Sequence, residues 1–304
     1  MTAKAGDRRN SPDLRAGLGG SETLVLDGAN GTELERRGVP CGLPLWSTHA
    51  LIQAPDIVAR IHADYAGAGA DVLTANTFRT QRRTLSRAGL GEQAAALTRL
   101  AVDLARREAR RFADERSIQV VGSAPPLEDC YRPDLVPEPA ALEREHAEHA
   151  ENLAEAGVDA ILVETMNCSR EAKAAVRAAR IAGTPVLVSF VCWDGSHLLS
   201  GEPLRVALDS VLPEDPDAVL VNCLPASNVG ACLPVLRASG KPFGAYCNLG
   251  APTDSERCSR SEEYVPADLA ERVAGWRADG ARLLGGCCGT TPEHIRAIAQ
   301  RLRS

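Results

Sequence analysis

The stretch ARLLGGCCGTTPEHIRAIAQRLRS (residues 281–304) indicates one buried strand followed by one amphipathic helix. The apolar residues of 281–288 run without polar alternation, as expected of a parallel strand that is buried on both faces. Thr291 can cap the following helix, and Pro292 suits its first turn. The later apolar residues recur at the spacing of one helix face: Ile295, Ile298, Ala299 and Leu302. The stretch therefore predicts a strand-then-helix unit.

Seven similar apolar runs precede this unit, and helical patterns separate most of them. The runs cover residues 23–28, 70–78, 118–124, 160–165, 185–192, 217–223 and 242–248. Eight such units in about 280 residues predict an α/β fold, a single (β/α)₈ TIM barrel, which typically needs about 250 residues. A doubly wound open sheet is the alternative, but it normally carries G-x-G-x-x-G after its first strand. Gly28–Gly31 does not supply that motif.

The domain organisation follows from this count. Residues 1–22 mix charge, Gly, Ser and Pro without an apolar signal core, so we expect a disordered leader there and a barrel domain over 23–304. Two long loops, Pro125–Pro139 and Leu249–Tyr264, follow the carboxyl ends of strands. Because that face of a barrel carries the active site, both loops are candidate lids or substrate walls.

The composition excludes some classes of function. The chain has 304 residues, of which 44 % are apolar, and a formal net charge of −6. Mild acidity argues against a nucleic-acid partner, and no apolar run approaches the ~20 residues that span a membrane. Ten cysteines without an export signal favour reduced thiols in a cytoplasmic protein over a disulfide scaffold. Some of these thiols then become candidate metal ligands.

Three cysteines stand at strand ends that a barrel brings together. Cys223 ends the sixth run, and Cys287 and Cys288 end the eighth. Three thiolates without a fourth Cys or His in these motifs suit catalytic zinc, which keeps one position open. Sulfur donors also favour zinc over magnesium or manganese. A vicinal Cys287–Cys288 disulfide, or buried thiols without a metal, remain alternatives on spacing alone.

Other cysteines and His294 lack such a context. We expect ordinary buried or surface thiols at Cys41, Cys130, Cys168, Cys192, Cys232, Cys247 and Cys258. His294 falls in the first turn of the last helix, and we do not expect it to bind a metal.

Five motifs in chain order resemble the homocysteine S-methyltransferase family, over residues 23 to 302. They are LDGANGTELERRG (26–38), ADVLTANTFRT (70–80), ILVETMN (161–167), VLVNC (219–223) and LLGGCCGTTPEHI (283–295). The resemblance implies that Cys223, Cys287 and Cys288 bind Zn²⁺. It also implies methyl transfer from a small-molecule donor, S-methylmethionine or S-adenosylmethionine, to the thiol of homocysteine, which gives methionine. Zinc suits this chemistry because it deprotonates a coordinated thiol, and the thiolate is the nucleophile.

The resemblance also implies roles for two acidic positions. Glu164 ends the fourth strand run and matches the glutamate that binds the amino group of homocysteine; a structural ion pair with an arginine is the alternative. Asp27, in the D-G-x-x-G-T motif, is a candidate to orient substrate. Gly28 and Gly31 would let backbone N–H groups approach a substrate carboxylate. A simple strand-to-helix turn explains the same Asp and Gly residues.

Four further residues are candidates for substrate contact. Asn76, in T-x-N-T-F, is a candidate polar contact, and Ser123 matches a family position near the amino-acid carboxylate. Asn222 precedes the first cysteine ligand and could support it. Trp46 resembles a family tryptophan near the donor, where an aromatic face suits a methylated cation. A packed surface side chain is the alternative for Trp46.

Two stretches depart from the family pattern where the donor should approach. APPLEDCYRPDLVP (124–137) replaces a Gly-Pro-Tyr-Gly type loop, and arginines follow T-N-T-F at Arg79, Arg82 and Arg83. A different thiol or a selenol acceptor is therefore an alternative, as is a zinc-binding barrel without turnover. The barrel consumes the chain, so we expect a free small-molecule donor or one delivered by a partner protein. The sequence indicates no oligomeric state.

Overall fold

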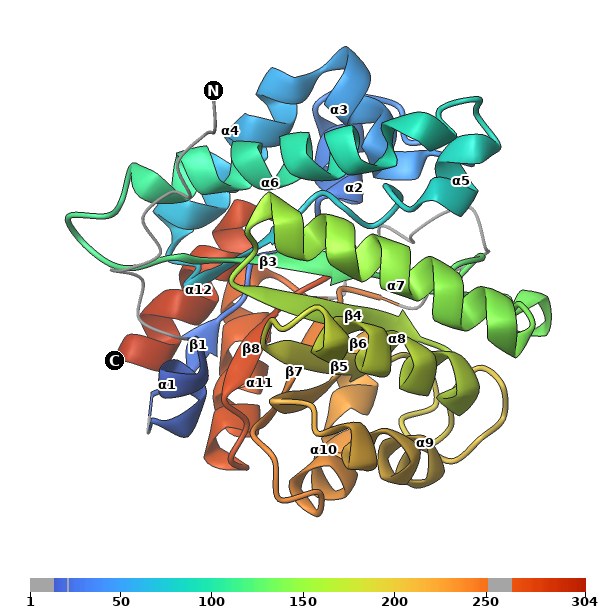
Figure 1. The fold of residues 1–304 in the computed structure, drawn as a ribbon. Coiled ribbons are helices and arrows are strands. Elements are labelled where there is room, and N and C mark those ends of the chain that lie inside the picture. Colours follow the sequence, from blue (N-terminus) through green and yellow to red (C-terminus); the bar gives the residue numbers. More distant parts are fainter. Residues whose placement is uncertain (1–13, 21, 251–263) are drawn as a thin grey trace.

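A computed structural model describes residues 14–20, 22–250 and 264–304, and it contains eight parallel strands that form a barrel (Figure 1). The strands are β1 (Leu24–Val25), β2 (Val72–Ala75), β3 (Gln119–Ala124), β4 (Ala160–Met166), β5 (Val186–Phe190), β6 (Ala218–Pro225), β7 (Phe243–Asn248) and β8 (Leu283–Gly286). Each lies inside, or overlaps, one of the eight apolar runs, so the strand prediction is confirmed.

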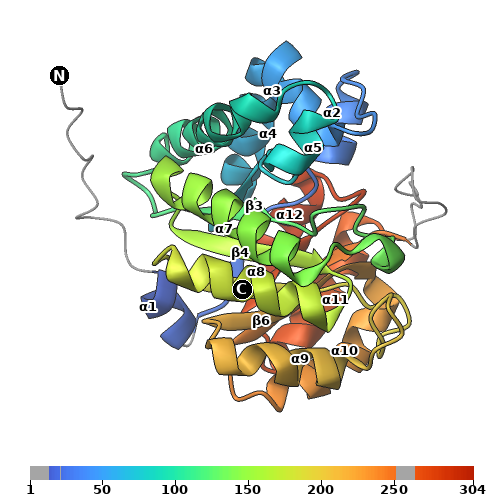
Figure 2. The same ribbon diagram turned by 45° about the vertical axis from the view of Figure 1, so that its right-hand side comes forward.

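Helices surround the strands (Figures 1 and 2). The α-helices are α1 (Leu14–Gly19), α2 (Gly31–Arg36), α3 (His49–Gln53), α4 (Pro55–Ala68), α5 (Arg82–Ser86), α6 (Ala94–Arg110), α7 (Pro139–Ala156), α8 (Ser169–Ile181), α9 (Leu204–Val211), α10 (Ala226–Arg237), α11 (Pro266–Ala278) and α12 (Pro292–Arg303). The short 3₁₀ helices are η1 (Trp46–Thr48), η2 (Gly91–Gln93), η3 (Pro133–Leu135) and η4 (Leu212–Glu214).

The sheet closes on itself. Its strand order is β1-β8-β7-β6-β5-β4-β3-β2, and every pairing is parallel. An isolated parallel bridge between Leu26 and Val72 joins the two end strands, and the Asp27 backbone N–H donates to the Val72 carbonyl at 3.0 Å. The (β/α)₈ barrel is therefore confirmed, and the open sheet is wrong.

Burial explains why continuous apolar runs form these strands. All residues of β3, β4, β5, β6, β7 and β8 are buried, since helices cover the outside and side chains fill the inside. The last helix begins as predicted, because Thr291 and His294 form a capping box. His294 Nε2 bonds to the Tyr264 carbonyl at 3.0 Å, so both ring nitrogens of His294 serve the fold.

The prediction of disorder over residues 1–22 does not hold for residues 14–19, which form α1. Leu14 and Leu18 are 2 % and 6 % exposed and pack with the side chains that fill the barrel. Arg15 also forms an ion pair with Asp217 at 2.7 Å. Figure 1 places α1 beside β1, at the end of the barrel from which the strands start. Apolar burial at that end is what orders this segment.

The structure describes the first of the two long predicted loops in full and the second only in part. Residues 125–138 are described and contain η3. Residues 251–263 of the second loop, with Cys258, lie outside the described residues. Among the helices that are described, none combines the length and the apolar character that crossing a bilayer requires.

Candidate active site

A cavity of about 410 Å³ lies at the carboxyl ends of the strands. Its lining comes from residues at or just beyond the ends of β1, β2, β3, β4, β6, β7 and β8. Most of the residues that were predicted from the sequence to form the site line this cavity: Asp27, Gly28, Gly31, Trp46, Asn76, Ser123, Glu164, Cys223, Cys287 and Cys288. Asn222 is buried directly behind the rim, next to Cys223 in the chain.

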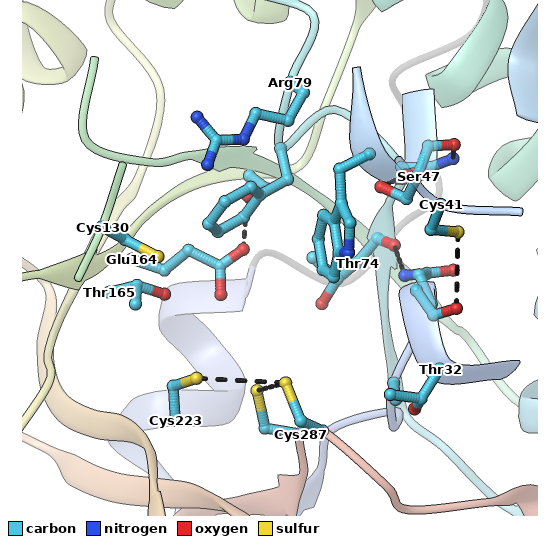
Figure 3. A pocket seen from close by; sticks show the side chains of 18 of the residues that line it. Thr32, Cys41, Ser47, Thr74, Arg79, Cys130, Glu164, Thr165, Cys223 and Cys287 are labelled. Atoms are coloured by element: carbon cyan, nitrogen blue, oxygen red, sulfur yellow. Dashed lines mark hydrogen bonds between the residues drawn. The ribbon is translucent and has the colours of Figure 1, made fainter. Parts of the chain in front are cut away.

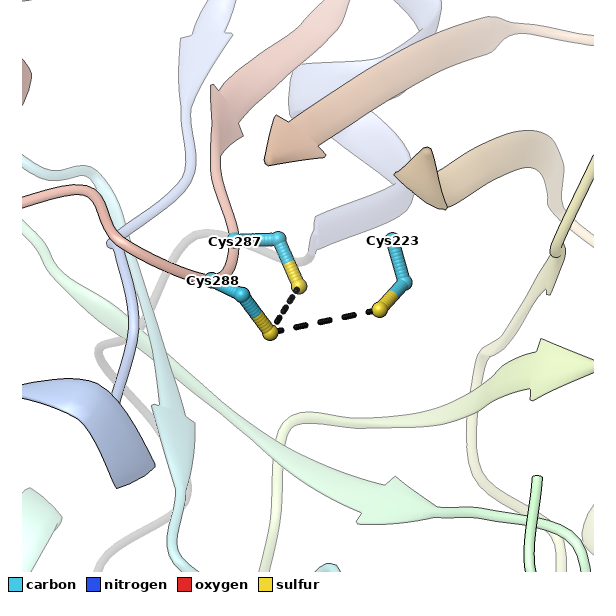
Figure 4. Close-up of side chains that lie close together, drawn as sticks. All are labelled: Cys223, Cys287 and Cys288. Carbon is cyan, nitrogen blue, oxygen red and sulfur yellow. Dashed lines mark hydrogen bonds between the residues drawn. The ribbon is translucent and has the colours of Figure 1, made fainter. Parts of the chain in front are cut away.

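The three cysteines form one cluster (Figure 4). Their sulfur atoms all lie within 4.8 Å of one another, with 3.9 Å from Cys223 to Cys288 and 3.9 Å from Cys287 to Cys288. Zn–S bonds of about 2.3 Å at tetrahedral angles would separate the sulfurs by about 3.8 Å. The donor set therefore fits one metal ion. No disulfide joins Cys287 to Cys288 in this structure.

The backbone at Cys223 departs from a regular strand. Cys223 has a φ of 55°, and the register between β6 and β7 shifts between Asn222 and Pro225. Thr165 in β4 has the same feature, with a φ of 58° at a register shift between Val163 and Met166. Such irregularities re-aim side chains at the rim of a barrel and interrupt the alternation of side-chain directions. In β4 the consecutive residues Glu164 and Thr165 both line the cavity, and in β6 Cys223 lines it.

Polar groups around Cys223 support a thiolate. The Tyr131 hydroxyl lies 3.0 Å from its sulfur, and the Asn248 amide donates to the same sulfur at 3.7 Å. Hydrogen bonds from Cys287 and Cys288 hold the pKa of the Cys223 thiol well below its ordinary value. The bond to Cys223 raises the pKa of Cys287. One thiol of the cluster ionises readily, and a bound cation would offset the repulsion of further thiolates.

Asn248, at the end of β7, connects two of the thiols. Its Oδ1 accepts the Cys288 backbone N–H at 3.0 Å, while its Nδ2 faces Cys223. Such support around ligands fixes their orientation. Neither Asn248 nor Tyr131 was predicted from the sequence. The signal for Asn248 was its place at the carboxyl end of an apolar run, which is also where Cys223 stands.

Glu164 lies in β4 on another wall of the cavity (Figure 3). Two hydroxyl groups hold its carboxylate. Ser123 donates to Oε1, and Tyr246 donates to Oε2 at 2.9 Å. Within the described parts of the chain Glu164 has no arginine partner, so the alternative of a structural ion pair finds no support. Burial raises the pKa of Glu164 to about 7. A cationic group entering the cavity would favour the ionised form.

Asp27 presents a second buried carboxylate. Its two oxygens accept hydrogen bonds from the Thr74 backbone at 2.8 Å and the Thr74 hydroxyl at 2.9 Å. Burial raises the pKa of Asp27 to about 8, and the negative charge of Glu164 adds to the rise. Two carboxyl groups that repel each other in one cavity make it receptive to a cation.

Three further candidates, Asn76, Ser123 and Gly28, contact other residues of the protein. Asn76 exchanges hydrogen bonds with Ser47, at 2.6 Å and 2.9 Å, and so fixes the segment that carries Trp46. Ser123 contacts Glu164 in this structure. A Cβ atom on Gly28 would meet the Tyr65 hydroxyl at 2.7 Å, so packing alone requires this glycine.

Trp46 lines the cavity and is only partly buried. Its ring packs edge-on against Phe78, with 5.4 Å between centroids. A Cβ on Gly31 would lie 2.3 Å from the Trp46 ring, so this glycine makes room for the indole. Trp46 therefore stands at the cavity wall, and its role beside the donor stays a prediction.

The two departures from the family pattern contact each other. Glu128, from the segment 124–137, accepts ion pairs from Arg83 at 3.0 Å and from Arg87 at 2.6 Å. Its backbone carbonyl accepts Arg79 Nη1 at 3.3 Å. Only Arg79 of the three predicted arginines lines the cavity. The acidic partners of Arg82 and Arg83 are Glu92, Glu148, Glu128 and Glu145.

Fold and site together define a barrel enzyme with a thiol cluster suited to a metal at its catalytic face. The family model described as homocysteine S-methyltransferase matches residues 24–302. The chain therefore belongs to the homocysteine S-methyltransferase family.

Individual relatives agree with this assignment. The homocysteine S-methyltransferase of Escherichia coli K12 is 33 % identical, covering 96 % of this chain and 99 % of that protein. The selenocysteine Se-methyltransferase of Brassica oleracea var. italica is 30 % identical, covering 92 % and 89 %. The crystal structure of the E. coli homocysteine methyltransferase MmuM in its metallated form has a TM-score of 0.83 and 30 % identity, covering 95 % of this chain and all of MmuM.

Proposed function

We propose that this protein transfers a methyl group from a small-molecule donor to the thiol of homocysteine, with zinc held by Cys223, Cys287 and Cys288. The observation that carries the proposal is the meeting, in one cavity, of three thiols spaced for a common ion and a buried carboxylate, Glu164. An amino-acid thiol has the two matching groups, a sulfur and an ammonium.

The residues of the chain would position the acceptor. Glu164 would bind the ammonium, with its carboxylate oriented by Ser123 and Tyr246. An ammonium in the cavity would favour ionisation of Asp27, which would then add negative charge to the same region. Asn248 and Tyr131 would keep the Cys223 sulfur in place. Bound zinc would supply the Lewis acidity that keeps the acceptor's sulfur ionised at neutral pH.

The transfer itself is a displacement at carbon. The acceptor's thiolate sulfur forms a bond to the methyl carbon, and the bond from that carbon to the donor's sulfonium sulfur breaks. The electron pair of the broken bond stays on the donor, which leaves as a neutral thioether. The aromatic surface of Trp46 and Phe78 at the cavity wall suits the positive charge that the donor loses in this step.

S-methylmethionine and S-adenosylmethionine are the donors we favour. The matched selenocysteine Se-methyltransferase supports a second candidate, in which the acceptor is a selenol. A selenolate would use the same thiol cluster, because selenium is also a soft donor.

The test is a matrix of donors against acceptors with the zinc-loaded protein, read by mass spectrometry. S-methylmethionine, S-adenosylmethionine and betaine are combined with homocysteine, cysteine and selenocysteine. Methionine formed from homocysteine and a sulfonium donor supports the proposal. Turnover with selenocysteine alone favours the second candidate, and no methyl transfer in any combination contradicts both.

A further inference from the structure

Arg79 is a buried cation at the wall of the cavity. Its side chain is 7 % exposed and lies over the Phe78 ring, with 5.5 Å from the guanidinium carbon to the ring centroid. Figure 3 shows Arg79 and the cysteines on opposite sides of the cavity, with Glu164 between them in this view. The lining of the cavity thus contains a positive group as well as acidic groups.

The charge of Arg79 has no carboxylate partner among the residues that the structure describes. Its Nη1 donates to the backbone carbonyl of Glu128, and its buried Nε has no hydrogen-bond partner. The Glu128 carboxylate is close in the chain, but Arg83 and Arg87 occupy it. Asp129 also lines the cavity but forms no ion pair with Arg79.

Burying the guanidinium of Arg79 without a carboxylate partner costs free energy unless a ligand supplies that partner. A buried charge requires a partner, and the planar guanidinium presents N–H groups in the geometry of a carboxylate. The neighbouring Arg82, Arg83 and Arg87 each form an ion pair with a glutamate, so acidic partners are present in this region. Within the part of the chain that the structure describes, Arg79 is held through a neutral carbonyl, and its Nε donor has no partner.

We propose that Arg79 forms a subsite for the carboxylate of an amino-acid substrate. The inference rests on the proposed function in that its ligands are amino acids. Glu164 and Asp27 would face the cationic end of a zwitterion, and Arg79 the anionic end. The carboxylate can belong to the thiol acceptor or to a sulfonium donor; both have the same recognising chemistry.

The test is direct binding to the zinc-loaded full-length protein, by calorimetry and without turnover. Two ligand pairs differ only in the carboxylate: homocysteine with 3-aminopropanethiol, and S-methylmethionine with (3-aminopropyl)dimethylsulfonium. R79M should weaken the carboxylate-bearing member of one pair by about 10- to 100-fold, the scale of a charge-assisted hydrogen bond. Its decarboxylated partner should change by less than about threefold, because the lost interaction is absent there. The affected pair identifies the source of the carboxylate.

R79K and R83M are the matched controls. R79K should keep part of the affinity, since lysine retains the charge but not the planar fork. R83M removes an arginine whose carboxylate partners lie outside the cavity, and it should leave all four affinities unchanged. Thermal unfolding gives a second readout: without ligand, R79M should be at least as stable as wild type, and R83M less stable.

Equal losses within both pairs, or no loss in either, would overturn the carboxylate subsite. These outcomes are separate from a failure of the proposed function, which would appear as absence of methyl transfer by the wild-type protein in the substrate matrix.

Discussion

Asn222 in β6 and Thr165 in β4 hold each other through two hydrogen bonds that cross the rim of the barrel. The Thr165 backbone N–H donates to Asn222 Oδ1 at 3.0 Å, and Asn222 Nδ2 donates to the Thr165 hydroxyl at 2.9 Å. Ser189 in β5 donates to the same Oδ1 at 2.7 Å. Glu164 precedes Thr165 and Cys223 follows Asn222, so this pair joins the carboxylate wall of the cavity to the thiol cluster.

The first prediction follows from that link. Asn222→Ala should weaken zinc binding by about 10- to 100-fold, the usual effect of removing support behind a metal ligand. It should weaken homocysteine binding as well, because the backbone at Thr165 and Cys223 loses its common support. Competition with a chelator measures the first effect and calorimetry the second. Ser189→Ala, which leaves the Asn222–Thr165 bonds in place, should have the smaller effect; unchanged zinc affinity in Asn222→Ala contradicts the link.

The second prediction concerns metal content. Protein purified with reductant should contain about one zinc per chain, as expected of a single three-thiolate site. Cys223→Ser and Cys287→Ser should lose the metal, as measured by atomic emission. Cys232→Ala, which changes a buried thiol on α10 away from the cluster, should keep it. Full zinc occupancy in both cluster variants would show that the metal binds elsewhere.

The third prediction separates the ammonium from the sulfur of the acceptor. Glu164→Ala should keep its zinc but weaken homocysteine binding by roughly 2–4 kcal/mol, the scale for losing the partner of a buried charge. A thiol without the amino group gains nothing from Glu164, so its binding should change little. Kinetic constants for homocysteine and its deaminated analogue measure the difference. Equal losses for the two thiols would mean that Glu164 does not bind the ammonium.

The fourth prediction is a pH dependence of ligand binding. Burial raises the pKa of Glu164 to about 7 and that of Asp27 to about 8. An ammonium ligand favours the ionised carboxylates and therefore lowers both pKa values on binding. Affinity should consequently rise from pH 6 to pH 8, with protons released on binding in that range.

Methionine is the ligand for this measurement, because it has no thiol proton to release. Calorimetry in buffers of different ionisation enthalpy counts the protons. Glu164→Gln should release fewer protons and should flatten the dependence between pH 6 and pH 8. A wild-type affinity that stays constant or falls over this interval is incompatible with the prediction.

Much of the site could be predicted from the sequence because strand ends are local features. Cys223, Cys287 and Glu164 each stand at or near the carboxyl end of an apolar run, and a parallel barrel brings all such ends to one rim. Once eight runs are counted, no contact information is needed to place these residues together. Their chemical types make a metal site one possibility at this rim, and the resemblance to the family implies zinc and the ammonium of homocysteine.

Other features depend on contacts that leave no periodic signal. Residues 1–22 have a composition typical of disorder, yet Leu14 and Leu18 become ordered because the open end of the barrel offers apolar surface. Tyr246 lies in a predicted strand, but its bond to Glu164 depends on the register between neighbouring strands. A single sequence specifies neither this packing at the end of the barrel nor the hydrogen bond between Tyr246 and Glu164.

The sequence by itself determined the barrel and placed the three thiols and Glu164 at strand ends, since hydrophobic periodicity and residue type suffice for these features. Zinc as the metal and the role of Glu164 were implied by the resemblance to the family. Only the tertiary structure decided how the two unusual stretches combine: Glu128 pairs with Arg83, and Arg79 lines the cavity with no carboxylate partner among the described residues. The physical reason is that charge compensation is set by distances in space. Whether a given arginine is paired depends on which side chains the fold places within reach, and neighbours in sequence do not reveal it.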